Sequence, residues 1–147
     1  MKKIFSIAVL FLLLTLGAHQ ANAQMCDSTA KLSAKYLVPP FVSDGQTYRA
    51  LILSNQNAEF QATFFAGTTY RISAATGLTE GNLIFSVYSY DPNSGQRELI
   101  FSNSQHNNAA YWDFKVNTTV EVVIEATLNP ASGKDSGCAV LLIGFKQ

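Results

Sequence analysis

One loop of the chain carries several oxygen-bearing side chains of the kind that bind calcium. Residues 91–95 read Asp-Pro-Asn-Ser-Gly and lie between two runs rich in aromatic residues. Calcium takes about six to eight oxygen ligands, and an EF-hand-like loop starting at Asp91 needs an acid where the chain has Ser102. The same loop suits a turn, because Asp91 can cap it, Pro92 presets φ and Gly95 accepts a positive φ. We therefore expect a turn, and no metal site.

Catalytic combinations of residues are sparse. Glu121 and Glu125 would share one face of a strand about 13 Å apart, whereas glycosidase carboxylates stand about 5–9.5 Å apart. His106 follows Ser and Gln and precedes two Asn residues, a setting typical of a solvated loop rather than of a general base. We predict no catalytic residue, no metal and no cofactor. A hydrolase site assembled across strands, from Asp113 or Glu125 with another acid, stays open as an alternative.

The two cysteines, Cys26 and Cys138, lie near the two ends of the chain. In an oxidising compartment they are expected to form one disulfide. A thiol nucleophile or a metal pair is the weaker interpretation, because no second set of ligands accompanies them.

Tyrosines provide the best candidate for binding. In their predicted strands, Tyr88, Tyr90 and Tyr111 alternate out of phase with the apolar series, so they face away from the core. If these strands are neighbours, the three rings form one platform with Asp113 and Arg97 nearby, suited to a sugar ring or a protein partner. The alternative is that these tyrosines are covered by a loop or reflect β propensity alone.

The N-terminus has the layout of a secretory signal peptide over residues 1–23. Lys2 and Lys3 precede an apolar run, and Ala21-Asn22-Ala23 offers small residues at a cleavage site. The run is shorter than the roughly 20 residues of a membrane span, and no later run approaches that length. We expect export to the periplasm or the medium. Lipidation at Cys26 is a minor alternative, since Met25 is not the small residue that lipoprotein processing prefers.

Removing the signal peptide leaves 124 residues, with eight basic and ten acidic side chains. That length suits one domain. The weakly acidic balance lacks the basic surface that nucleic acid binding requires. We expect an N-terminal extended segment over 24–47, with at most a helical turn at Asp27–Lys35, and a β domain over 48–147.

Alternation of apolar and polar residues dominates the chain after residue 47 and predicts an all-β, jelly-roll-like antiparallel β-sandwich of about eight strands. The predicted strands are Tyr48–Ser54, Glu59–Phe65, Thr69–Ala75, Leu83–Tyr90, Arg97–Asn103, Ala110–Val116, Thr119–Leu128 and Cys138–Phe145. Trp112 belongs to an apolar, core-facing series. The last strand is apolar on both faces, which indicates a central strand or one covered by a loop.

Part of the chain carries a pattern known from one family. A predicted strand ends at Ala66-Gly67, the next opens with Tyr70, and an alternating strand, an Asp-containing turn and a Ser/Asn-rich loop follow. On these features, the region from about Glu59 to Ala126 resembles the β-sandwich pre-peptidase C-terminal (PPC-like) domains of secreted bacterial peptidases. The resemblance implies a jelly-roll-like fold and a non-catalytic accessory or binding role. Val116-Asn117-Thr118-Thr119 stands where the family has a Gly-Thr-Tyr-Tyr-type run.

These observations together predict a secreted or periplasmic, non-catalytic module that binds a glycan or a protein. A structural, envelope-associated interaction protein is the first alternative, and the hydrolase is the second.

Overall fold

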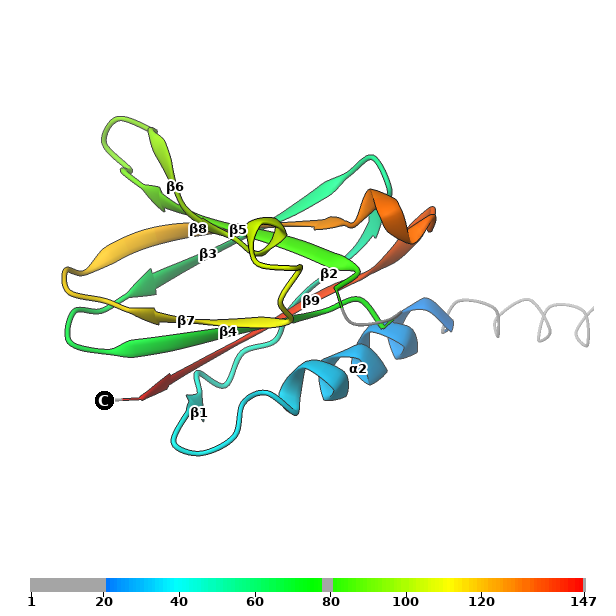
Figure 1. Cartoon of the computed structure of the whole chain (residues 1–147), viewed down its shortest axis with the longest axis horizontal. Coiled ribbons are helices and arrows are strands. Elements are labelled where there is room, and N and C mark those ends of the chain that lie inside the picture. The colour runs from blue at the N-terminus through cyan, green and yellow to red at the C-terminus, as the bar shows by residue number, and fades with distance from the viewer. Residues whose placement is uncertain (1–20, 78–80, 147) are drawn as a thin grey trace, which may run out of the picture.

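The computed structural model describes residues 21–77 and 81–146 (Figure 1). These residues form one α-helix, nine strands and two short 3₁₀ turns. In chain order they are α2 (Ala21–Ala34), β1 (Val42–Ser43), β2 (Tyr48–Leu53), β3 (Asn57–Phe64), β4 (Thr69–Ala75), β5 (Leu83–Tyr90), β6 (Arg97–Ser102), η1 (Asn103–Gln105), β7 (Tyr111–Lys115), β8 (Val120–Leu128), η2 (Pro130–Ser132) and β9 (Ser136–Lys146).

The strands form two antiparallel sheets in the order of a jelly roll. Sheet A has the order β1-β9-β4-β7, with β2 also paired to β9, and sheet B has the order β3-β8-β5-β6. Apart from the β5–β6 hairpin and the step from β1 to β2, each connection crosses from one sheet to the other, as jelly-roll topology requires. The predicted all-β sandwich is confirmed, and the two-residue β1 is the strand that alternation does not reveal.

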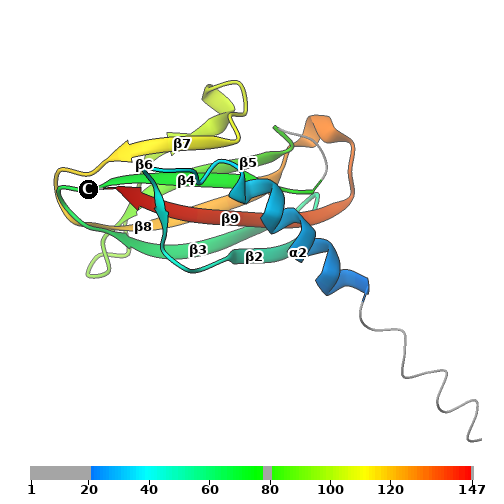
Figure 2. The ribbon, with the colours of Figure 1, turned by 90° about the horizontal axis from the view of Figure 1, so that it is seen from below.

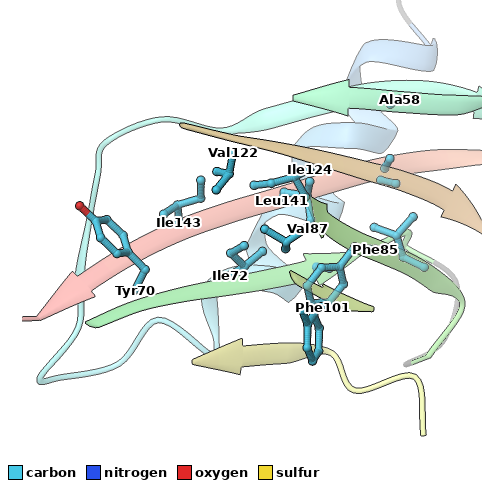
Figure 3. Close-up of a cluster of buried hydrophobic side chains, with 14 of the residues drawn as sticks. Ala58, Tyr70, Ile72, Phe85, Val87, Phe101, Val122, Ile124, Leu141 and Ile143 are labelled. Atoms are coloured by element: carbon cyan, nitrogen blue, oxygen red, sulfur yellow. The ribbon is translucent and has the colours of Figure 1, made fainter. Parts of the chain in front are cut away.

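The core lies between the inner faces of the two sheets (Figure 3). Leu83, Phe85 and Val87 of β5 are all buried, whereas the residues that alternate with them are half-buried on the outer face. On β8 the inward-facing Ile124 and Ala126 are fully buried from solvent, and Val123 on the outer face is buried as well. The phase of alternation therefore predicts the inner faces correctly. This phase is well specified, because a shift of one residue would place Glu121 and Glu125 in the core.

Strand β9 is buried on both faces for two reasons. It lies between β4 and the β1–β2 edge, and α2 packs across its outer face (Figure 2). Cys138 and Val140 face the helix, while Ala139 and Leu141 face the core. The two-sided apolar pattern thus marks a central strand, and its cover is a helix.

The predicted extended segment over 24–47 is wrong for its first part, because α2 is helical over Ala21–Ala34. The helix presents small residues to the sheet at helical spacing, Cys26, Thr29, Ala30 and Ser33, and tertiary contacts hold it. Ser33 hydrogen-bonds Ser73 of β4 with 2.7 Å between the hydroxyl oxygens. A stripe of small and polar residues has little hydropathic contrast, so the sequence pattern indicates only a turn.

The predicted signal peptide lies outside the described residues except for 21–23, which begin α2. The Cys26–Cys138 disulfide is present, so in this structure the Cys26 sulfur is bonded to Cys138 rather than free for lipidation. Among the described residues, no helix combines the length and apolarity of a membrane span.

Candidate functional site

The two outer faces of the sandwich differ in what covers them. Helix α2 contacts β9, β4 and β2 of sheet A and lies away from sheet B (Figures 1 and 2). On sheet B, Tyr88 and Tyr90 point outward from β5 and are half-buried between neighbouring side chains. Their partners in register on this face are Val123 and Glu121 on β8, and Leu99 and Arg97 on β6. We call this outer surface of sheet B the tyrosine face.

Arg97 spans the tyrosine face. Its guanidinium donates two hydrogen bonds to Glu59, with Nη1–Oε1 at 2.8 Å and Nη2–Oε2 at 2.9 Å, and a third at 3.3 Å to Glu125. In register, Arg97 stands beside Tyr90, whereas Glu125 stands beside Ser86, so the arginine passes across the row of Tyr88. The hydrogen bonds from Arg97 lower the pKa of Glu59.

Glu59 and Glu125 stand directly opposite each other on β3 and β8, so the fold does bring two carboxylates together across strands. Their chemistry does not fit a general acid, which needs a raised pKa, because that of Glu59 is lowered by Arg97. Both side chains are on an open sheet face and bind the same arginine. The pair is therefore best explained as an ion-pair network.

The loop between β5 and β6 is the turn expected from the sequence. Asp91 accepts hydrogen bonds from the backbone N–H of Asn93 at 2.9 Å and from the Ser94 hydroxyl at 2.7 Å. Gly95 adopts a positive φ of 70° and donates its N–H to the Asp91 carbonyl. The hydrogen bonds from Ser94 and Asn93 to its carboxylate lower the pKa of Asp91, the Ser94 hydroxyl being the first cause. Within the described part of the chain, no cluster of three or more His, Cys, Asp or Glu is placed to hold a metal ion.

Tyr111 and Asp113 lie on the outer face of sheet A and take part in a different network. Arg71 of β4 pairs with both carboxylate oxygens of Asp113, at 2.6 and 2.9 Å, and donates to the Tyr36 carbonyl at 3.0 Å. Its guanidinium lies 4.1 Å from the ring centre of Phe41 and 4.5 Å from that of Tyr111. Arg71 therefore ties the segment after α2 to sheet A through these rings and hydrogen bonds.

The structure thus does not bring the five predicted binding residues into one platform. Tyr88, Tyr90 and Arg97 lie on sheet B, and Tyr111 and Asp113 lie on sheet A. The phase of alternation correctly turns all three rings outward, but the sheet to which each strand belongs is set by strand order. Glu59 and Arg71, which complete the two networks, were missed because their ion-pair partners lie 38 and 42 residues away.

His106 and Trp112 form part of an aromatic cluster at the edge where β6 meets β7. The His106 ring stacks on Phe101 with centroids 5.0 Å apart, and it lies 4.4 Å from Trp112. Trp112 is half-buried and packs against the core, as its phase predicts. His106 is exposed, yet it covers aromatic rings rather than standing in solvent alone.

No family model and no curated protein sequence matches the chain. Among solved structures, the crystal structure of Aeromonas hydrophila PliG, described as a periplasmic lysozyme inhibitor of g-type lysozyme, is similar with a TM-score of 0.51 and 15% sequence identity. The match covers 74% of this chain and 90% of PliG. At this identity the two proteins share a fold.

Proposed function

We propose that this protein is an exported, non-catalytic module that binds another protein through the tyrosine face. The observation that carries the proposal is the asymmetry of the sandwich. Helix α2 covers the outer face of sheet A, whereas the described residues place no helix over the outer face of sheet B. Export is supported by the disulfide, which persists in oxidising compartments, and by the signal-peptide pattern of residues 1–23.

A protein fits this face better than a glycan does. Sugar rings stack on open aromatic surfaces, but the Arg97 side chain crosses the row of Tyr88. Tyrosine and arginine are enriched in protein interfaces, and the face also exposes the apolar side chain of Leu99. The similarly folded PliG is described as an inhibitor of a lysozyme, which is itself a protein, and this supports the same class of partner.

Assembly of an envelope structure through edge strands is the second candidate. Strand β6 is an edge of sheet B and exposes Leu99 and Ile100. The strand also carries Arg97 and Glu98 and shifts register opposite Val87 and Tyr88. Charges and bulges are the devices by which sheet edges avoid pairing with other chains, so binding is favoured over assembly. The resemblance to pre-peptidase C-terminal domains stays a prediction and is compatible with a binding role.

The test is capture of a partner by the protein exported with its own leader and carrying a C-terminal tag. Envelope extract from the source cells is crosslinked to the parent, to the Tyr88→Ser/Tyr90→Ser variant, and to a Leu51→Ser/Leu53→Ser control. The two leucines are exposed apolar residues on the edge strand β2 of sheet A. We expect one protein to be captured by the parent and the control and lost from the tyrosine variant. Equal capture by all three contradicts the proposed face, and no capture contradicts the function.

A further inference from the structure

A cleft of about 640 Å³ opens where the edge of sheet B meets the segment that joins β1 to β2. One wall comes from Asp44, which precedes β2, and from Tyr48, the first residue of β2. The other wall comes from residues 61–65 at the end of β3 and just after it. Tyr70 and Phe145 also line the cleft, and Phe64 stacks on Tyr70 with ring centroids 4.3 Å apart. The volume of the cleft is within the range of about 300–1,000 Å³ that is typical of ligand-binding sites.

The polar groups of the cleft are arranged around one carboxylate. Asp44 accepts a hydrogen bond from the Tyr48 hydroxyl at 3.2 Å and another from the backbone N–H of Gln46 at 2.8 Å. Burial, followed by the negative charge of Asp44, raises the pKa of Tyr48 to about 12. The phenol therefore stays protonated near neutral pH and is available to donate its hydrogen bond to Asp44.

Asp44 is the single charged side chain among the residues that line the cleft. It forms no ion pair with another described residue, in contrast to Asp27, Glu59 and Asp113, which all pair with arginines. Phe65 stands at the cleft with 60% of its surface exposed. Tyr70 lies at one end of the core cluster, with its hydroxyl pointing away from the other labelled side chains (Figure 3).

An unpaired carboxylate beside aromatic rings is complementary to a cation on a hydrocarbon stem. The carboxylate pairs with the charge, ring faces attract a cation, and the rings also cover the apolar stem. We propose that the cleft receives a lysine or arginine side chain of the protein partner, with Asp44 as the charge partner and Phe65 and Tyr48 as its walls. This inference rests on the proposed function and names the chemistry by which the partner is recognised.

The cleft is continuous with the tyrosine face. Gln61 and Thr63 line the cleft, and in register they stand beside Val123 and Glu121 of β8, which neighbour Tyr88 and Tyr90 on β5. A single partner that lies on the tyrosine face therefore reaches the cleft at the β3 edge. This continuity favours a side chain of a protein over an independent small molecule.

The experiment uses the isotope-labelled disulfide-bonded protein and the peptide acetyl-Gly-Arg-Gly-amide, followed by amide chemical-shift mapping. The matched probe replaces arginine by citrulline, which has the same shape and no charge, and maltotriose serves as a sugar probe. We expect the arginine peptide to shift amides of residues 44–48 and 61–65, and the citrulline peptide to bind at least tenfold more weakly. The Asp44→Asn variant is expected to weaken arginine binding by about tenfold or more, because it removes a charged hydrogen-bond acceptor.

Asp135→Asn is the control, since it removes one carboxylate from an exposed loop outside the cleft. Tyr48→Phe is the second variant, which keeps the ring if Asp44→Asn disturbs folding. Equal binding of the arginine and citrulline peptides, binding of maltotriose alone, or no shifts at all overturns the cleft inference. A partner captured in the envelope experiment with an unchanged yield from Asp44→Asn also overturns it and leaves the proposed function standing. Failure of capture with peptide binding intact contradicts the proposed function instead.

Discussion

Arg97 and Glu59 stand on the two opposite edge strands of sheet B, β6 and β3, yet their side chains meet across its outer face through two hydrogen bonds of 2.8 and 2.9 Å. The same arginine reaches Glu125 on β8, one of the two strands that lie between them. Two glutamates directly opposite each other repel, and a shared cation removes that repulsion. The network therefore fixes the position of the β5–β6 hairpin relative to the rest of the tyrosine face.

We predict that Arg97→Gln lowers the melting temperature at pH 7 and has less effect in acid. The folded pKa of Glu59 is lowered from an ordinary value near 4.5, so its contribution to stability is present above that value and is lost as the pH falls through the folded pKa. The melting temperatures of the parent and of Arg97→Gln are expected to converge as the pH is lowered from neutral to acid. Glu98→Gln on the same strand is the control, and a difference that is constant with pH contradicts the network.

The Arg71 network predicts that a conservative change is not neutral. Arg71→Lys keeps the charge but loses the planar guanidinium that pairs with both oxygens of Asp113 and lies against Phe41 and Tyr111. We expect a loss of about 1.5–3 kcal/mol in unfolding free energy, of the size expected for a hydrogen bond to a charged group. Faster amide hydrogen exchange is expected in residues 35–44. Urea titration and exchange measure the two effects, and unchanged exchange in that segment argues against the role of Arg71.

We predict that removing the Cys26–Cys138 disulfide lowers the stability of the protein strongly. Cys26 and Cys138 are separated by 112 residues, so the bond restricts most of the unfolded chain. Replacing both cysteines by serine is expected to lower the unfolding free energy by roughly 2–5 kcal/mol. Urea titration measures the unfolding free energy of this variant and of the parent, the parent being measured with and without a reductant. A variant as stable as the oxidised parent would falsify this account.

The close approach of Gly77 to helix α2 allows a test of how closely the helix packs against the rest of the protein. Gly77 has a positive φ of 76°, and a Cβ atom there would meet the Thr29 side chain of the helix. Gly95 has a similar φ of 70°, but a Cβ atom there would meet nothing within 4 Å, so Gly95→Ala measures backbone strain alone, about 1–2 kcal/mol. We expect Gly77→Ala to lower the unfolding free energy by more than Gly95→Ala does. Equal losses in urea titration contradict close packing at this point.

The alternation of side chains along the sequence by itself determines much of the local structure of this protein. It predicts eight of the nine described strands and the inward direction of Phe85, Val87 and Ile124. The outward direction of Tyr88, Tyr90 and Tyr111 follows from the same alternation, and the residue types at 91–95 predict the turn. These features are local, because a strand has a period of two and a tight turn is specified by a few consecutive residues.

Tertiary structure alone decided which of these residues meet. Tyr111 belongs to sheet A because β7 pairs with β4, some 40 residues earlier, and a period of two carries no information about that partner. Helix α2 was missed for a related reason, since small residues such as Ser33 gain stability from the sheet beneath them rather than from a hydropathic pattern. The cleft at Asp44 arises where three distant segments converge, so its charge and its aromatic walls become a site only after the chain has folded.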